Sequence, residues 1–285
     1  MNKISLKNVN VKKFTTLIRR SSSNENLIFI SLKGSQFEST AYNRNKSALK
    51  SVTADLENMC EEFSNPIDGE VKIHFSNASK LITSLSLVGD EMVDADFYID
   101  ETNYAHKIVI KNSEMNLTIN CADKEAVDFL EIPDNARYSI FEDTSKLQVS
   151  VNITDSEFKK MNALLGLNKD SVRVFFNLVG DEMVISEIES TDENVRSLVN
   201  DMLHDSDYEG FRKFDKLYDK KLVTTELVKN NVTEYLECFN KQWFGWIDTG
   251  DKSYTIEFHS NKIKFITFDD DNVKTYVVLT PVRFA

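Results

Sequence analysis

The hydrophobic pattern along the chain has two periods, one typical of helices and one typical of strands. Segments with these two periods follow one another in an order that recurs. Residues 9–20, VNVKKFTTLIRR, place apolar side chains three and four positions apart, which is the spacing of an amphipathic helix. The next segment, NLIFISLKGSQFESTAYN, alternates apolar and polar residues on both sides of a Lys-Gly pair and predicts a β-hairpin. A further strand is expected near residues 52–59.

The pattern then restarts in the order strand, helix and strands. EVKIHF predicts a strand, NASKLITSLSL a helix with Asn77 as its N-cap, and EMVDADFYID another strand. AHKIVIKNSEMNLTINC completes the unit as a hairpin. Residues 1–121 therefore predict one domain of two strand-helix-strands units. Residues 122–145 lack a sustained period and contain Pro133, so we expect them to form a connector.

Residues 146–285 predict a similar second domain. KLQVSVNI is a candidate strand, TDSEFKKMNALLGLNKD a helix with Thr154 as its N-cap, and SVRVFFNLVGDEMVISEIES a hairpin. Residues 190–208 are acidic and polar, and we expect an insertion there. A strand near residues 211–218 and a helix over residues 225–244 precede three final strands: SYTIEFHS, NKIKFITF and VKTYVVLTP. The fold class predicted is α+β, with four strand-helix-strands units in two domains.

The heptad LVGDEMV occurs twice, at residues 87–93 and 178–184. A duplicated unit should carry the same secondary structure around both copies. The first copy is expected to end a helix at Gly89, whereas the second is expected to span a hairpin turn. The duplication therefore follows the strand-helix-strands order, and the heptad does not mark it.

Composition places the chain among soluble globular proteins. Of its 285 residues, 41% are hydrophobic and 28% are charged, with few Gly and Pro. No run of about 18 apolar residues exists, and the N-terminus lacks the apolar stretch of a signal peptide, so we expect a cytoplasmic protein without a membrane partner. The three cysteines lie far apart without a CxxC pair, which favours buried free thiols over disulfides or a zinc site.

The charges are unevenly distributed along the chain. A formal net charge of −12 argues against a simple nucleic-acid binder, because phosphate contacts need Lys and Arg. Residues 9–20, however, contain four cations and no acid, so the other residues carry −16. On the predicted helix these cations lie opposite the apolar stripe: Lys12, Lys13, Arg19 and Arg20. These cations could contact phosphates, but an ordinary solvated helix face explains the same pattern. Both interpretations stay open.

Sequence motifs for catalysis are absent. No GxGxxG, GxxxxGK[ST], HExxH or GxSxG is present, and the four histidines are isolated. Asp269, Asp270 and Asp271 lie between two predicted strands, where adjacent acids indicate a turn rather than a metal site. Trp243 and Trp246 are better explained by packing than by base stacking. We therefore expect a protein that is not an enzyme and has no catalytic residue, metal or cofactor.

Four strand-helix-strands units in two domains, with basic residues on the helices of an acidic chain, resemble a DNA sliding clamp, and specifically the T-even phage type of processivity factor. "KLITSLSLVGDEMV" followed by the hairpin "HKIVIKNSEMNLTI" resembles the second helix of that family and the segment that follows it. "TDSEFKKMNALLGLNKDSVRVFF" resembles the first helix and strand of its second domain, and "TYVVL" its final strand. The resemblance covers nearly the whole chain, but the expected insertion and the Trp-rich stretch at residues 243–246 depart from it.

The resemblance implies a ring with helices lining the hole, sheets outside, and edge strands pairing between subunits. A positive lining meets phosphates without reading bases, and an acidic exterior avoids stray DNA. Since such a ring has six domains, a two-domain chain implies a homotrimer. The implied partners are double-stranded DNA of any sequence, a DNA polymerase and an ATP-dependent clamp loader. The candidate DNA-binding residues are Lys12, Lys13, Arg19, Arg20, Lys80, Lys159, Lys160 and Lys229.

The resemblance also implies an apolar pocket for partner peptides between the connector and the C-terminal strand. The residues expected around it are Tyr138, Ile140, Val278, Leu279, Thr280 and Pro281. Core packing explains the strand residues equally well.

Two other classes of protein remain as alternatives. A phage structural or scaffolding protein would also be acidic and free of motifs, but it gives no reason for cations confined to helices. A nuclease or another enzyme would need a convergent acidic or histidine-containing site, for which the sequence offers only turns. The polymerase, the loader, the host and the role of the insertion stay open.

Overall fold

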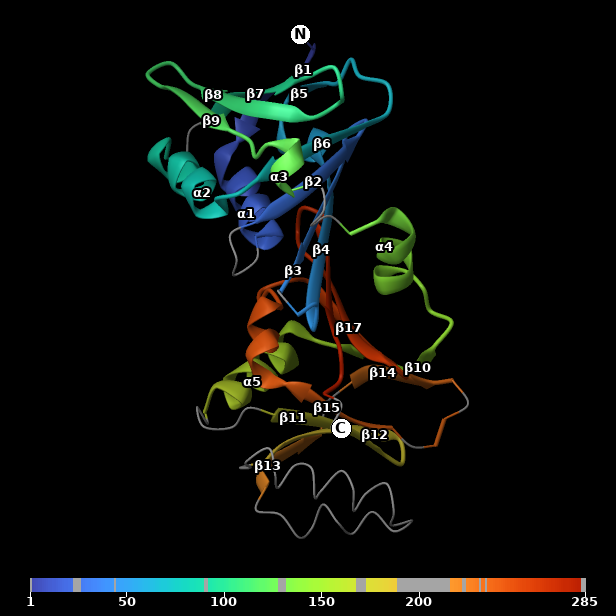
Figure 1. Ribbon diagram of the computed structural model, residues 1–285. Helices are drawn as coiled ribbons and strands as arrows, with labels where there is room; N and C mark the ends of the chain where they lie inside the picture. The colour runs from blue at the N-terminus through green and yellow to red at the C-terminus, as the bar shows by residue number, and fades with distance from the viewer. Residues whose placement is uncertain are drawn as a thin grey trace. The chain divides into compact units, whose positions relative to one another are not determined.

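The computed structural model describes residues 2–22, 27–43, 45–89, 92–127, 132–167, 173–188, 216–221, 224–230, 232–233 and 235–282 (Figure 1). The chain forms two compact units. Unit 1 comprises Met1–Asp143 and Phe268–Val277, and unit 2 comprises Thr144–Thr267 and Val278–Ala285. In the described part of the chain, no helix has the length and hydrophobicity needed to cross a bilayer.

Unit 1 contains two groups of strands and two main helices. The first sheet has the order β5-β1-β7-β8-β9. Its strands are β1 (Asn2–Asn10), β5 (Glu62–Ser64), β7 (Met92–Ile99), β8 (Ala105–Lys111) and β9 (Asn116–Asn120). The second group has the order β18-β4-β3-β2-β6. Its strands are β2 (Ile28–Lys33), β3 (Gln36–Tyr42), β4 (Ala48–Asp55), β6 (Glu70–Phe75) and β18 (Lys274–Leu279).

The two main helices of unit 1 each begin directly after an asparagine cap. The first was expected from residue 9, but Val9 and Asn10 still belong to the first strand. Helices α1 (Val11–Ser21) and α2 (Ala78–Leu87) lie side by side (Figure 1). The side chain of Asn10 accepts a hydrogen bond from the backbone N–H of Lys13 at 3.1 Å, so that α1 starts directly after β1. Asn77 caps α2 in the same way at 2.9 Å, which confirms the predicted cap. Two short helices, α3 (Lys124–Val127) and α4 (Asp134–Phe141), follow β9.

The strands and hairpins predicted for unit 1 are confirmed with one exception. The strand expected near residues 52–59 runs instead over Ala48–Asp55, and the 3₁₀ helix η1 (Leu56–Met59) follows it. Asp55 caps η1 by accepting a hydrogen bond from the backbone N–H of Glu57 at 3.1 Å. This local cap ends the strand where the apolar alternation alone suggested that it continues.

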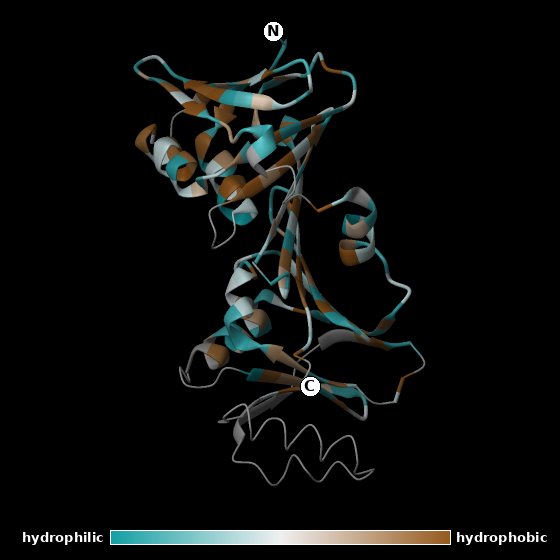
Figure 2. Cartoon of the chain, viewed as in Figure 1, coloured by the Kyte–Doolittle hydropathy of each residue, from teal (hydrophilic) through white to brown (hydrophobic). Residues whose placement is uncertain are grey.

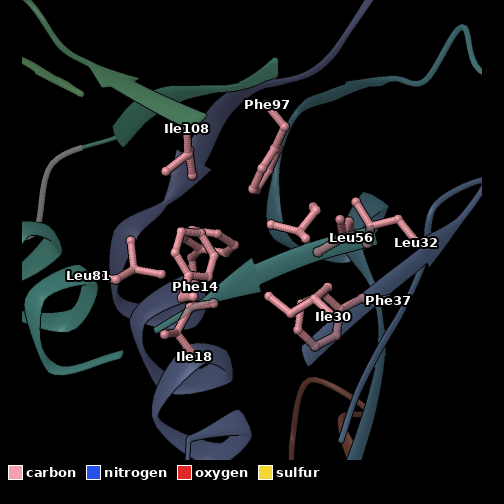
Figure 3. A pocket seen from close by; sticks show the side chains of 11 residues that line it. Phe14, Ile18, Ile30, Leu32, Phe37, Leu56, Leu81, Phe97 and Ile108 are labelled. Atoms are coloured by element: carbon pink, nitrogen blue, oxygen red, sulfur yellow. The ribbon is translucent and has the colours of Figure 1, made fainter. Parts of the chain in front are cut away.

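Both groups of strands and both helices share the core of unit 1. Phe14 and Ile18 of α1 are 2% and 1% exposed, and together with Leu81, Phe97 and Ile108 they surround a void of about 10 Å³ (Figure 3). This void has room for about one water at most, so it is packed core rather than a ligand site. In Figure 2 both helices carry hydrophobic and hydrophilic residues, as expected when one face is buried.

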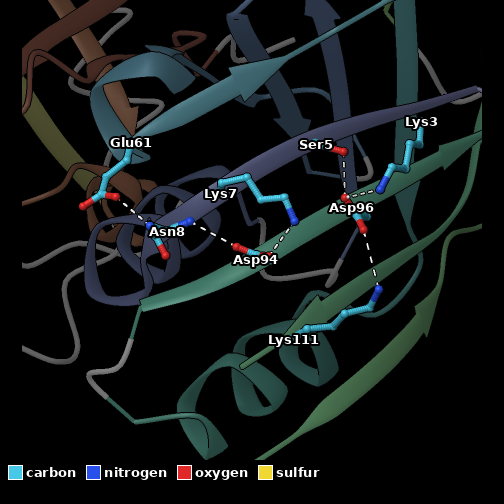
Figure 4. A network of polar contacts seen from close by, with 8 residues as sticks. All are labelled: Lys3, Ser5, Lys7, Asn8, Glu61, Asp94, Asp96 and Lys111. Atoms are coloured by element: carbon cyan, nitrogen blue, oxygen red, sulfur yellow. Dashed lines mark hydrogen bonds and ion pairs between the residues drawn. The ribbon is translucent and has the colours of Figure 1, made fainter. Parts of the chain in front are cut away.

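The first sheet carries a polar network on the face opposite the core (Figure 4). Asp96 of β7 is only 2% exposed, and its carboxylate accepts a hydrogen bond from the Ser5 hydroxyl at 2.7 Å. It also pairs with Lys3 at 3.1 Å and with Lys111 at 3.7 Å. Burial by itself would raise the pKa of Asp96, but the hydrogen bonds from Ser5 and Lys3 outweigh burial and lower it.

A β-bulge extends this network. Asn8 lies in the left-handed region, with φ at 51°, where the register between β1 and β7 shifts. Its backbone N–H donates to Asp94 at 3.2 Å, and its side-chain amide donates to Glu61 at 2.6 Å. Lys7 donates to Asp94 at 2.5 Å, and this hydrogen bond raises the pKa of Lys7. The network therefore joins β1 to β7 through side chains as well as through the backbone.

Unit 2 also contains two groups of strands. One has the order β14-β10-β16-β17, formed by β10 (Leu147–Ile153), β14 (Thr224–Lys229), β16 (Ser253–His259) and β17 (Lys262–Phe268). The other has the order β13-β12-β11-β15, formed by β11 (Arg173–Val179), β12 (Glu182–Ile188), β13 (Lys216–Lys221) and β15 (Leu236–Asn240). Helix α5 (Asp155–Leu167) follows β10, and the Thr154 hydroxyl accepts from the Glu157 N–H at 3.2 Å, which confirms the predicted cap.

Two predictions for unit 2 lie wholly or partly outside the described residues. The insertion expected at residues 190–208 is one of them. The strand expected near residues 211–218 is described only from Lys216 onward, where β13 begins.

The helix predicted over residues 225–244 is wrong. These residues contribute to β14, β15 and the 3₁₀ helix η4 (Lys241–Trp246). In the sheets, Leu227 lies opposite Val151 of β10, and Phe239 lies opposite Val174 of β11. The apolar spacing of three and four residues therefore belongs to two separate strands, and pairing with distant strands decided the structure.

The two copies of LVGDEMV occupy different structural places, as predicted. The first ends α2 and leads into β7, whereas the second forms the turn between β11 and β12. Gly89, with φ at 76°, and Gly180, with φ at 60°, both adopt the left-handed backbone that glycine adopts without steric cost. Both copies thus use their glycine to end one element before the next begins.

Candidate nucleic-acid interface

Helix α1 presents cations on the side opposite its buried stripe. Lys12 and Arg19 are exposed, whereas Phe14 and Ile18 are buried. No carboxylate among the described residues pairs with Lys12 or Arg19. These two side chains can therefore contact a phosphate without the loss of an existing ion pair.

The other two cations of α1 are held by an acidic turn just before β18. The Asp269 carboxylate shapes this turn by accepting hydrogen bonds from the backbone N–H groups of Asp271 and Val273, both at 2.9 Å. The Nζ atom of Lys13 lies 2.6 Å from the Asp271 carboxylate. The Arg20 guanidinium lies 3.5 Å from the Asp269 carboxylate. The acids predicted to form a turn do so. Asp269 and Asp271 also pair with two of the four cations of α1.

These two ion pairs differ in burial. The side chains of Arg20 and Asp269 are 10% and 13% exposed, whereas those of Lys13 and Asp271 are 37% and 33% exposed. Arg20 therefore does not lie on the exposed cationic side of α1 that its place in the sequence suggested, but is buried and paired with Asp269. A groove of about 260 Å³ runs between α1 and the turn, and Lys13 and Asp271 both line it.

Cations of the other predicted helices are also exposed. Lys80 on α2 has no ion-pair partner among the described residues. On α5, Lys159 pairs with Asp155 at 2.5 Å, and Lys160 pairs with Glu157 at 3.2 Å. The Lys159–Asp155 pair is partly exposed and contributes little to stability, so a phosphate can replace Asp155, whereas Glu157 is buried, with its side chain only 9% exposed.

Lys229 is not on a helix, which corrects its place among the candidate lining residues. It ends β14, and its Nζ atom lies 2.5 Å from the Asp181 carboxylate and 3.2 Å from the carbonyl oxygen of Gly180. The hydrogen bond from Lys229 lowers the pKa of Asp181. Lys229 thus binds the hairpin turn between β11 and β12. It was a candidate DNA contact because it was predicted to lie on a helix, and it lies on a strand instead.

The residues expected to form a peptide pocket differ in exposure. Tyr138 on α4 is 61% exposed, and Ile140 is half-buried. The other four are buried or half-buried: Val278, Leu279, Thr280 and Pro281. At 1% exposure each, Val278 and Leu279 are accounted for by core packing, and the pocket stays a prediction.

Two contacts fasten α4 to the rest of unit 1. The Nε atom of Arg137 lies 3.2 Å from the Glu38 carboxylate of β3. The ring of Phe141 lies 6.1 Å from the ring of Tyr276 on β18, measured between centroids. Tyr138, between these two anchors, remains largely exposed to solvent.

Comparison with known proteins identifies the architecture. No protein-family model matches the chain, and no curated protein matches it significantly. Solved structures of PCNA match it over almost its full length. A. fulgidus PCNA bound to the C-terminal region of FEN-1 superimposes with a TM-score of 0.64 at 15% identity, covering 100% of both chains.

Two further PCNA structures agree with this match. PCNA from Thermococcus kodakaraensis gives a TM-score of 0.65 at 11% identity, covering 98% of this chain and 100% of that one. The PCNA2–PCNA3 complex from Sulfolobus tokodaii gives 0.63 at 10% identity, covering 97% and 98%. The chain has the sliding-clamp fold. Identities this low establish the fold alone, and the fold class predicted from the sequence is confirmed.

A compact trio of titratable side chains on β16 and β17 is largely buried. Glu257 lies 2.5 Å from Lys264 and 3.2 Å from His259. His259 and Lys264 are 0% and 2% exposed, so a substrate does not reach them. The part of the chain that the structure describes contains no group of three potential metal ligands. That the protein is not an enzyme stays a prediction.

Sequence reasoning missed Asp269 and Asp271 as partners of α1. Their place between two strands predicted a turn, and about 250 residues separate them from Lys13 and Arg20. No periodicity connects positions so far apart. The only available signal was complementary charge, since one acidic and one basic cluster stand out in the sequence.

Proposed function

We propose that the chain is the subunit of a DNA sliding clamp, which encircles duplex DNA and tethers a replicative DNA polymerase for processive synthesis. The observation that carries this proposal is a set of exposed helix cations, Lys12, Arg19 and Lys80, on the sliding-clamp fold of a chain with net charge −12. Long Lys and Arg side chains meet phosphates in many geometries, so they hold DNA without reading its sequence.

The proposed assembly is a homotrimer, because a clamp ring has six domains and this chain forms two compact units. Strand β9 lies at the edge of one sheet in unit 1, and β13 lies at the edge of another in unit 2. Edge strands offer unpaired backbone groups, and pairing β9 of one copy with β13 of the next would close a ring by repeated identical contacts. Light scattering should then give about three times the 32.7 kDa subunit mass. A stable monomer at high concentration would contradict this assembly.

The proposed partners are a DNA polymerase and an ATP-dependent clamp loader, which dock through short peptides near the connector. One of the PCNA structures similar to this chain holds the C-terminal region of FEN-1, which supports docking of this kind. The narrower resemblance to the T-even phage type rests on the sequence stretches given above. We propose from this resemblance that the protein acts in the cytoplasm of an infected bacterium.

Primer extension on a primed circular template tests the tethering function. With the cognate polymerase and loader present, adding the chain should lengthen the products made in one binding event. The same template cut open should remove the effect, because a ring slides off a free end. Products of unchanged length on the circle would contradict the proposal.

A further inference from the structure

The acidic turn before β18 places the Asp271 carboxylate beside the Lys13 ammonium of α1. We propose that Asp271 competes with DNA phosphates for Lys13, so that this turn sets how tightly α1 holds DNA. The inference rests on the proposed clamp function and concerns the same helix.

The geometry allows the Lys13 ammonium to exchange partners. Lys13 and Asp271 lie 2.6 Å apart, and each side chain is about one-third exposed. Both line the groove of about 260 Å³ between α1 and the turn. An exposed ion pair of this kind is weak, so a phosphate that enters the groove can take the place of the carboxylate.

The neighbouring pair holds the competitor in position. Asp269 is fixed by two backbone N–H groups and by the buried guanidinium of Arg20. This anchor keeps the turn against α1, so Asp271 remains beside Lys13 whenever a phosphate leaves. Lys13 thus exchanges one anion for another, which weakens each contact and suits a protein that must move along DNA.

Asp271→Asn tests the competition, because it removes the charge and keeps the size of the side chain. Asp68→Asn is the matched control, since it removes the same charge from an exposed loop of unit 1. Each trimer is titrated with a short linear DNA duplex, and its affinity is measured by fluorescence anisotropy as salt is raised. Circular dichroism and light scattering are used to check that fold and assembly are unchanged in each variant. The Asp271→Asn change is repeated in a Lys13→Ala background.

We expect Asp271→Asn to increase the affinity for the duplex by up to about fivefold for each Lys13 that contacts DNA. Asp68→Asn should leave the affinity within about twofold of wild type, since no ion pair joins Asp68 to α1 in the described part of the chain and its exposed charge is screened. The gain should vanish in the Lys13→Ala background. Equal effects of Asp271→Asn and Asp68→Asn, or a gain that persists without Lys13, would overturn the inference. If the wild type is held no longer on circular than on linear DNA, the clamp proposal itself fails and the inference with it.

Discussion

Asp96→Asn should destabilise unit 1 more than its single charge suggests. The Asp96 carboxylate is 2% exposed and has three partners, Ser5, Lys3 and Lys111 (Figure 4). An asparagine oxygen can still accept from Ser5, but the loss of charge assistance should cost about 1 kcal/mol. The two lysines are 45% and 42% exposed, so losing both ion pairs should cost about 1 kcal/mol more. The expected total is about 2 kcal/mol, or about 4–8 °C in Tm.

Thermal and urea unfolding at pH 7 measure this loss, with Asp94→Asn as the control. Asp94 is 34% exposed and is bound by one lysine, so its replacement should cost less than about 1 kcal/mol. The pKa of Asp96 lies below its ordinary value of 3.8, so its contribution is present above that pH and is lost as the pH falls through the folded-state pKa. The difference between wild type and Asp96→Asn should therefore shrink in acid. Equal losses from the two variants, or a difference that grows in acid, would refute this reasoning.

Two further predictions concern binding. Lys12→Glu combined with Arg19→Glu should leave fold and assembly intact but lower the affinity for a linear duplex, and the salt slope of that affinity should fall by about 0.9 for each phosphate that the variant no longer neutralises. Unchanged affinity would mean that this face of α1 is only solvated. Tyr138→Ala should weaken binding of a polymerase C-terminal peptide, measured by fluorescence anisotropy, while retention on DNA stays the same, because this exposed ring lies on α4 and not on α1; unchanged peptide affinity would place the pocket elsewhere.

Local signals predicted most elements of the fold. The apolar spacing of three and four residues predicted helix α1, whereas its capping by Asn10 emerged only from the structure. The hairpins were equally clear because each carries alternation on both sides of a turn, as at Gly34, where φ is 62°. In these segments the residues that decide the structure lie within about ten positions of one another.

Long-range interactions explain what the sequence did not predict. Leu227 and Phe239 fit a helix by spacing, but β10 and β11 provide hydrogen-bonding partners that no local pattern reveals. The candidate DNA interface changed for the same reason. Arg20 forms an ion pair with Asp269, and Lys229 forms one with Asp181. Both partners are distant in sequence. Spacing alone could identify cations on a helix face but not their counter-ions.

Release from DNA on linearisation tests most directly whether the chain encircles DNA. The protein is loaded on a closed circular plasmid with one restriction site, isolated with it by gel filtration, and then treated with the restriction enzyme. A ring should co-elute with the circle at physiological salt and leave it after the cut, since no bond to a particular sequence retains it. The same cut between bound blocking proteins at both ends should preserve binding. Protein that remains on unblocked linear DNA as long as on the circle would contradict the account.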